Sequence, residues 1–239
     1  MDYAAVVSTS SGFLALGVIP PIIWLLIYLR EDRHAEPVHL ILITFLGGAA
    51  AAIFALLAQE ALFYKTDPFT NFFFTFFIVA LVEEYAKYLA AKLLAFSRKD
   101  FNEPIDAMIY MMTAGMGFAA MENILFLFNQ SYNPQMLIGR NLILGAKLSI
   151  ARFIGANFLH ALSSGVVGYA IARAWFSPHR KHVIALGILA AACLHAGFDY
   201  LIILKDHLPG SALYLAALLS SALIVILIDF HKLKGETAG

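Results

Sequence analysis

Two adjacent glutamates, Glu83 and Glu84, lie with Lys87 one helical turn later inside a strongly apolar stretch of the chain. Residues 69–96 around them are almost all hydrophobic, so a helix here has almost no polar face. An ionisable side chain at the centre of a bilayer costs at least about 2.5–3.5 kcal/mol and marks function by default. The alternative without a catalytic role is that Glu84 and Lys87 form a structural ion pair across one helical turn.

Three further apolar stretches carry polar side chains away from their ends. These side chains are Glu122 and Asn123; Asn157, His160 and Ser164; and His195 and Asp199. Spacings of three and four residues place the members of the last two groups on one helix face. At 1.5 Å per residue, Glu83, Glu122, His160 and His195 lie about 20–27 Å from their assumed cytoplasmic helix ends. This shared depth predicts one polar site inside a helix bundle.

Carboxylates and imidazoles together supply the groups needed for acid–base hydrolysis. A glutamate can activate water while His160, His195 or Asn123 stabilises the oxyanion. Two histidines and a carboxylate (Glu122, His160 and His195) also form a workable zinc set, although the chain has no HExxH motif. The spacing leaves open whether a divalent metal such as zinc takes part.

A proton-coupled transporter or channel is the alternative function, because glutamate and histidine chains in membranes are typical of proton relays. Against it, the chain shows no obvious inverted repeat. A non-catalytic scaffold would not need polar groups at one depth in four spans.

The composition supports an all-α membrane protein. The 239 residues are 61% hydrophobic and 13% charged, which is unlike an ordinary soluble domain. The formal net charge is zero, so no electrostatic case for nucleic-acid binding exists. Apolar runs predict about seven transmembrane helices in a single domain, 1–239. The runs cover about 12–29, 38–63, 69–96, 104–128, 154–176, 182–204 and 211–230.

Residues 130–153 form the one long connection, and we expect an interfacial amphipathic helix or an extension of the fifth span, either of which can gate the bundle.

Lysine and arginine in the loops predict the orientation of the chain in the membrane. One side collects Arg30, Arg33, Arg98, Lys99, Arg180, Lys181, Lys232 and Lys234, and the other Lys65, Arg140, Lys147, Arg152 and Lys205. This bias predicts an outside N-terminus and a cytoplasmic C-terminus.

The motifs taken in order resemble the PrsW family of intramembrane proteases and, more distantly, the type II CAAX prenyl endopeptidases. The resemblance runs from the third span to the sixth. It rests on Glu83-Glu84-Tyr85-Ala86-Lys87, on Glu103-Pro104-Ile105-Asp106, on Gly115-Met116-Gly117-Phe118 continuing to Glu122-Asn123, on His160-Ala161, and on His195-Ala196-Gly197-Phe198-Asp199. One departure is Ala107, where the family pattern suggests glycine.

The resemblance implies an endopeptidase of a bacterial cell membrane that cuts membrane-anchored proteins, as in site-1 cleavage of an anti-sigma factor on the outer side. The family's functional positions then fall on Glu83, Glu84, Glu122, His160, His195 and Asp199. Lys87, Phe118, Asn123 and Asn157 are the supporting positions. Family members are often called metalloproteases, whereas the CAAX enzymes resemble glutamate-dependent hydrolases, so the metal question stays open.

Overall fold

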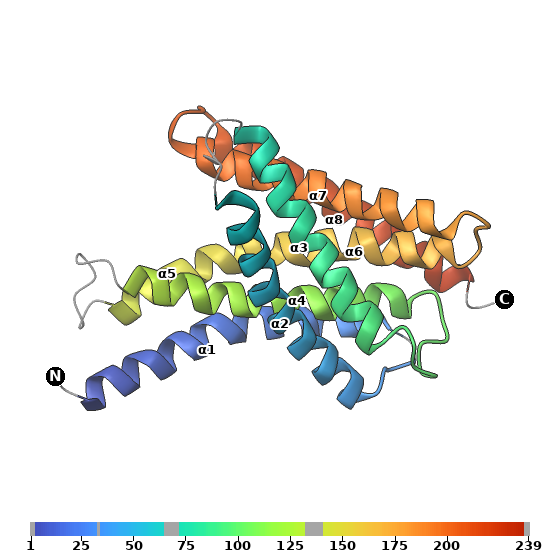
Figure 1. Ribbon diagram of the computed structural model, residues 1–239, viewed down its shortest axis with the longest axis horizontal. Coiled ribbons are helices and arrows are strands. Elements are labelled where there is room, and N and C mark those ends of the chain that lie inside the picture. The colour runs from blue at the N-terminus through green and yellow to red at the C-terminus, as the bar shows by residue number, and fades with distance from the viewer. Residues whose placement is uncertain (1–2, 33, 65–71, 132–140, 237–239) are drawn as a thin grey trace.

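A computed structural model describes residues 3–32, 34–64, 72–131 and 141–236. Within these ranges the chain forms eight α-helices and two short 3-10 turns (Figure 1). The α-helices are α1 (Tyr3–Tyr28), α2 (Val38–Phe63), α3 (Phe72–Leu94), α4 (Asp106–Ser131), α5 (Asn141–Ile154), α6 (Ala156–Ala174), α7 (Arg180–Ile203) and α8 (Ser211–Glu236). The 3-10 turns are η1 (Leu29–Glu31) and η2 (Leu204–Asp206).

Six described segments are long and apolar enough to cross a membrane: Ser11–Glu31, Val38–Phe63, Asp106–Asn129, Ile143–Ala174, Arg180–Ile203 and Ser211–Leu233. Helix α3 has 23 residues and reaches about 34 Å, which exceeds the roughly 30 Å hydrocarbon core of a bilayer. Helix α3 carries more charged residues than any of the six apolar segments does, and this is what distinguishes it from them. The prediction of an all-α polytopic bundle with about seven spans is therefore confirmed, and the termini lie at opposite ends (Figure 1).

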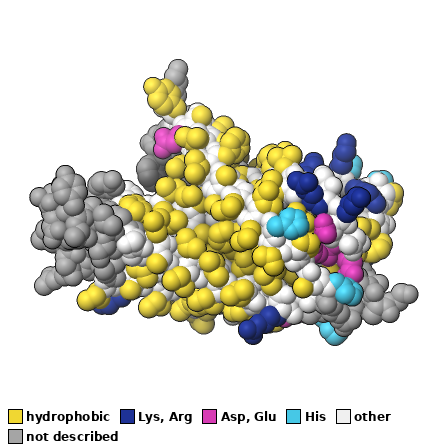
Figure 2. Space-filling model, turned by 90° about the horizontal axis from the view of Figure 1, so that it is seen from below, with side chains coloured by type: hydrophobic (Ala, Val, Ile, Leu, Met, Phe, Trp, Pro, Cys, Tyr) yellow, Lys and Arg dark blue, Asp and Glu magenta, His cyan; other side chains and the backbone are white. Residues whose placement is uncertain are grey.

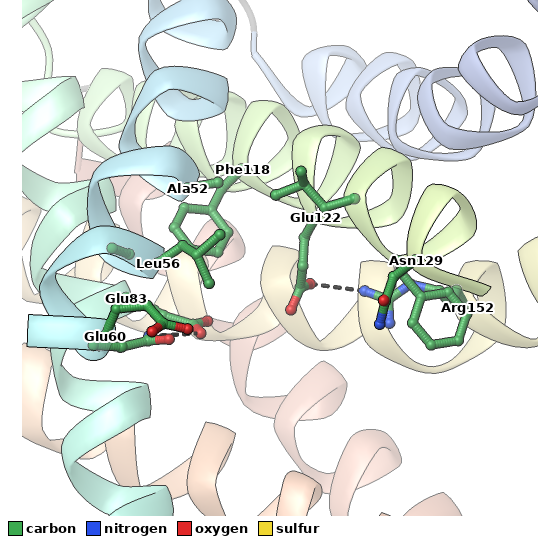
Figure 3. A pocket seen from close by; sticks show the side chains of 12 residues that line it. Ala52, Leu56, Glu60, Glu83, Phe118, Glu122, Asn129 and Arg152 are labelled. Carbon is green, nitrogen blue, oxygen red and sulfur yellow. Dashed lines mark hydrogen bonds and ion pairs between the residues drawn. The ribbon is translucent and has the colours of Figure 1, made fainter. Parts of the chain in front are cut away.

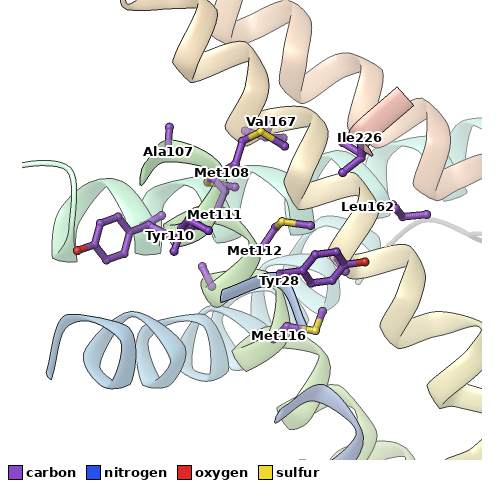
Figure 4. Packing of buried hydrophobic residues seen from close by; sticks show 14 of the residues in the cluster. Tyr28, Ala107, Met108, Tyr110, Met111, Met112, Met116, Leu162, Val167 and Ile226 are labelled. Carbon is purple, nitrogen blue, oxygen red and sulfur yellow. The ribbon is translucent and has the colours of Figure 1, made fainter. Parts of the chain in front are cut away.

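Helix α4 forms the centre of the bundle and packs against α1, α2 and α6. Its methionines Met108, Met111, Met112 and Met116 are fully buried, and Figure 4 shows them between neighbouring helices. From Ala107 to Met121 the helix is apolar on nearly every side, as expected of a helix at the centre of a bundle. Unbranched methionine fills irregular gaps well, so this core tolerates helices that cross at different angles.

Two glycines let α2 and α4 approach closely. A methyl group added to Gly48 would collide with the backbone of Ala114, and one added to Gly117 would collide with the backbone of Phe45. Small residues at such crossings permit the close packing that holds membrane helices together. On the other side of α4, a Cβ on Gly168 would lie 2.6 Å from Cα of Met108. These contacts fix α4, and the side chains that it carries, against α2 and α6.

The long connection is helical along its second half. Helix α5 continues into α6 through a single break at Gly155, so the fifth span begins well before the expected residue 154. Ser149 Oγ donates to the Leu16 carbonyl at 2.7 Å, and Trp24 Nε1 donates to the Phe153 carbonyl at 2.9 Å. Helix α5 is thus attached to α1 as an extension of the span. Residues 132–140 of the predicted connection lie outside the described part.

Charged side chains gather at one end of the molecule, while apolar side chains cover its middle (Figure 2). The connections α1–α2, α3–α4 and α6–α7 meet at this end (Figure 1). Arg30, Arg98, Lys99, Arg180, Lys181 and Lys232 belong to this side. Arg33, Lys65, Arg140 and the side chain of Lys234 lie outside the described part. The orientation in the membrane stays a prediction.

Candidate active site

The structure brings the predicted polar residues of α3, α4, α6 and α7 into one cluster. One carboxylate oxygen of Glu83 and one ring nitrogen each of His160 and His195, the atoms that could bind a metal, all lie within 4.8 Å of one another. The imidazole rings of His160 and His195 meet edge to face, with their centroids 5.1 Å apart. The shared depth expected from residue counting along the helices therefore corresponds to direct proximity.

Glu84 and Lys87 form the innermost part of the cluster and are completely buried. Lys87 Nζ donates to Glu84 Oε1 at 2.7 Å and lies 4.6 Å from the centroid of the Phe118 ring. Glu84 Oε1 also accepts from Ser163 Oγ at 3.0 Å and lies 2.8 Å from His195 Nδ1. One carboxylate oxygen thus organises three side chains, which suits a positioning role better than contact with substrate.

The hydrogen bonds define how His160 is used. Its Nδ1 lies 2.8 Å from Lys87 Nζ, and its Nε2 lies 2.8 Å from Glu122 Oε2. Because an ammonium group only donates, Nδ1 must accept, and a neutral imidazole then carries its proton on Nε2. His160 therefore donates to Glu122 and connects the inner ion pair to α4.

Glu83 differs from Glu84 in that it borders open space. It is 8% exposed, and its Oε1 accepts from Gln59 Nε2 at 3.2 Å. Its Oε2 is buried and has no hydrogen-bond partner among the described residues. His195 Nε2 lies 3.6 Å from this oxygen, and the same nitrogen lies 3.5 Å from Asp199 Oδ2. An unpaired carboxylate oxygen beside an imidazole is suited to bind and activate a water molecule.

A second set of contacts surrounds Glu122. Arg152 Nη2 donates to Glu122 Oε2 at 2.7 Å, and Arg152 Nε donates to Asn123 Oδ1. Asn123 Nδ2 donates to Asn157 Oδ1 at 2.8 Å and to the Gly17 carbonyl at 3.2 Å. The supporting positions Asn123 and Asn157 therefore link α4, α5, α6 and α1, while Phe118 packs beside Lys87 and His160.

Three residues of the site were missed by the sequence argument: Gln59, Ser163 and Arg152. Gln59 lies near the end of an apolar span, and the sequence pattern of Arg152 indicates only a loop charge that bears on orientation. Ser164 lies on the same predicted helix face as His160, but its Oγ has no hydrogen-bond partner within the described part of the chain. Its neighbour Ser163 bonds to Glu84 instead. A mixed polar pair such as Gln59-Glu60 inside a span was the available signal.

Two cavities reach the cluster. The first holds about 520 Å³ and is bordered by α2, α3, α4 and α5, with Glu83, Glu122 and Arg152 on its wall (Figure 3). The second holds about 370 Å³ and is bordered by α4, α5, α6 and α7, with His160, His195 and Asp199 on its wall. The cluster is therefore accessible from two sides although most of its members are buried.

The donor set fits a divalent metal in type and spacing. Two imidazoles with one carboxylate are a common set for catalytic zinc. The group that the structure brings together contains Glu83, whereas the set expected from the sequence contained Glu122. The contact of His195 Nδ1 with Glu84 matches the carboxylate partner that zinc-bound histidines usually have on the ring nitrogen that does not bind the metal. His160 would have to exchange its contact with Lys87 or Glu122 for the metal.

Comparison with known proteins assigns the chain to a family. A family model described as PrsW family intramembrane metalloprotease matches residues 36–228. Three bacterial relatives, each named Protease PrsW, illustrate the similarity. The protein of Geobacillus kaustophilus is 27% identical over 82% of this chain and 82% of its own. Those of Clostridioides difficile and Bacillus subtilis are 28% and 25% identical, over 80% of this chain in both cases and over 79% and 83% of their own.

No solved structure matches this chain. The family match covers α2 to α7 and most of α8, and so it contains every residue of the cluster. The relatives favour proteolysis over the alternative of proton-coupled transport. The chain is a multi-pass bacterial membrane protein and an intramembrane protease, and it belongs to the PrsW family.

Proposed function

We propose that Glu83 activates the water molecule that hydrolyses the substrate's peptide bond. The observation that carries this proposal is the place of Glu83 on the cavity wall, where its buried Oε2 has no hydrogen-bond partner among the described residues and lies 3.6 Å from His195 Nε2. Glu84 Oε2 is likewise unpaired within the described part of the chain, but Glu84 borders neither cavity. Glu84, with three partners on one oxygen and no exposure, is the positioning member of the glutamate pair.

In this mechanism Glu83 takes a proton from water while the hydroxyl oxygen attacks the carbonyl carbon. The carbon–nitrogen bond then breaks, and the same proton passes to the leaving nitrogen, so that a carboxyl and an amino terminus result. His195 donates from Nδ1 to Glu84, so its Nε2 is placed to accept from and orient the water. That nitrogen faces Glu83 and Asp199, and the doubly protonated ring can also donate to the oxyanion. Asp199 orients His195, and Lys87 with Glu122 holds His160.

A metal-dependent version uses the same residues, and the family description supports it. Glu83, His160 and His195 would hold the ion. When bound, zinc lowers the pKa of a water molecule and polarises a carbonyl. In that version Glu83 is a ligand, and Glu122, next to His160, is the remaining carboxylate at the centre of the cluster. Retention of zinc by the purified protein separates the two versions.

We propose that the substrate is a membrane-anchored protein, with site-1 cleavage of an anti-sigma factor as the specific form. The cluster lies among helices long enough to span the bilayer, so a bond cut there belongs to a segment in or beside the membrane. The predicted orientation, with the N-terminus outside, puts the cluster toward the outer side.

The test compares protein N-termini by mass spectrometry in membranes of cells that carry the wild type, Glu83→Gln or Asp100→Asn at equal abundance. Asp100 is an exposed carboxylate in the α3–α4 connection and serves as the matched control. New N-termini in or beside membrane spans are expected with the wild type and Asp100→Asn but not with Glu83→Gln. If the three sets of N-termini are identical across growth and stress conditions, the proposal is wrong, and proton flux becomes the next measurement.

A further inference from the structure

The two cavities share one wall. Glu122, Phe126 and Arg152 border both of them. Of the remaining cluster residues, Glu83 borders only the first cavity, whereas His160, His195 and Asp199 border only the second. The carboxylate proposed to activate water therefore faces one cavity, and the imidazoles of His160 and His195 face the other.

Although these groups face different cavities, they lie close to one another. The atoms of Glu83, His160 and His195 that could bind a metal lie within 4.8 Å of one another. A carbonyl group that reaches all three must therefore lie at the boundary between the cavities. In an extended chain successive residues are about 3.3 Å apart, so the residues on either side of that carbonyl would extend in opposite directions. One flank would enter each cavity.

Arg152 closes the shared wall through its contacts with α4. Its guanidinium bonds to Glu122 at 2.7 Å, bonds to Asn123, and lies 4.9 Å from the centroid of the Phe126 ring. Figure 3 shows the ion pair that joins Arg152 and Glu122, both of which line the first cavity. The arginine comes from the last turn of α5, three residues before the break at Gly155. All three partners lie on α4. Rotation of the Arg152 side chain, or a small motion of α5 about Gly155, would therefore break the contacts between α5 and α4 that close the wall.

We propose that the two cavities are the two halves of one substrate channel, and that Arg152 must leave Glu122 for the polypeptide to cross between them. This inference rests on the proposed function and adds the path of the substrate. The ligand is an extended polypeptide segment, with one side of the cleaved bond in each cavity. Small and aliphatic residues line both halves, including Ala52, Ala55 and Leu56 in the first and Ala151, Ala156 and Ile202 in the second. Such walls suit the apolar residues of a membrane-anchored segment.

The path is tested by photo-crosslinking in the Glu83→Gln background, which keeps substrate uncut. The photoreactive residue p-benzoylphenylalanine replaces Leu56 for the first cavity or Ile202 for the second, both of which are exposed. The same replacement at Leu186, an exposed residue on the opposite half of α7, is the control. The probe is a biotinylated peptide with a cleavage sequence from the N-terminus comparison at its centre.

Mass spectrometry of the crosslinked peptides gives the result. We expect the probe at Leu56 to capture residues on one side of the cleaved bond, the probe at Ile202 to capture residues on the other side, and Leu186 to capture none. Capture of the same side by both probes, or no capture at Ile202, overturns the inference. Cleavage by the wild type is measured separately, so loss of the proposed function and loss of this inference are distinguishable.

The role of Arg152 is tested with Arg152→Ala in the same background. Removal of the bridge raises the fraction of protein that admits substrate, so crosslinking below saturation is expected to rise at least about threefold at both positions. Arg152→Lys keeps the charge and is expected to give an intermediate yield. Arg98→Ala, which removes an exposed arginine in the α3–α4 connection, is the control and is expected to give the parent yield. Unchanged or lower crosslinking in a folded Arg152→Ala protein contradicts the role of Arg152.

Discussion

Lys87→Met is expected to destabilise the protein strongly. Lys87 and Glu84 are both fully buried and 2.7 Å apart, so the substitution leaves a carboxylate without its counter-charge. Breaking a buried pair by removing one partner costs about 3–5 kcal/mol. Glu84 keeps Ser163 and His195 as neighbours, so we expect the lower end, about 3 kcal/mol. Nδ1 of His160 also loses Lys87, the group that donates a hydrogen bond to it.

The assay is reversible unfolding in mixed detergent micelles with increasing dodecyl sulfate, for Lys87→Met, Glu84→Gln and the double variant. Because the double variant removes both charges, its loss is expected to fall below the sum of the single losses by about 2 kcal/mol. Lys92→Met removes an exposed lysine from the same helix and is expected to stay within about 0.5 kcal/mol of the wild type. If Lys87→Met loses less than about 1 kcal/mol, or if the losses add, the ion pair does not stabilise the cluster as argued.

Three further outcomes are expected. Burial raises the pKa of Glu36 from 4.5 to about 8, so its contribution to the stability of the folded state is fully present below about pH 4.5 and is lost as the pH rises through 8. The unfolding midpoint of Glu36→Gln, measured across that range, should therefore fall less with rising pH than that of the wild type. Gly117→Ala should lower the free energy of unfolding by about 1–3 kcal/mol, because its methyl group meets the backbone of Phe45. Gly197→Ala, where nothing lies within 4 Å, should be neutral or stabilising in the same assay, and the reverse order would contradict the packing argument. If the metal-dependent version holds, His195→Ala should lose zinc retention by at least about tenfold, measured by elemental analysis after gel filtration, whereas equal zinc content would remove His195 from the ligand set.

The proximity of the buried polar residues was predictable because each sits at a definite depth in a long apolar helix. A charge inside such a helix has few acceptable environments. The convergence of polar side chains from α3, α4, α6 and α7 follows from this rule together with helix periodicity. Helix bounds were close for α2 and α7, whose long apolar runs define the two ends of each helix.

Other features depend on contacts between helices and were not predictable. Nothing local in the sequence distinguishes Ser163 from Ser164, since the choice depends on how α6 is rotated against α3. The continuation of α5 into α6 was obscured by polar residues such as Arg152, which are satisfied by α4 rather than by water. Whether Glu83 or Glu122 joins His160 and His195 in the group that could bind a metal likewise depends on distances of a few ångströms.

The most direct test of the central claim is the cleavage rate of purified Glu83→Gln in lipid vesicles on a substrate from the N-terminus comparison. Glutamine keeps the shape of the side chain and its contact with Gln59 but cannot accept the proton from water. The account predicts a loss of at least about 10²–10⁴-fold in rate, with an unfolding curve like that of the wild type. A folded Glu83→Gln protein that cleaves within about tenfold of the wild-type rate would contradict the assignment of Glu83 as the water-activating residue.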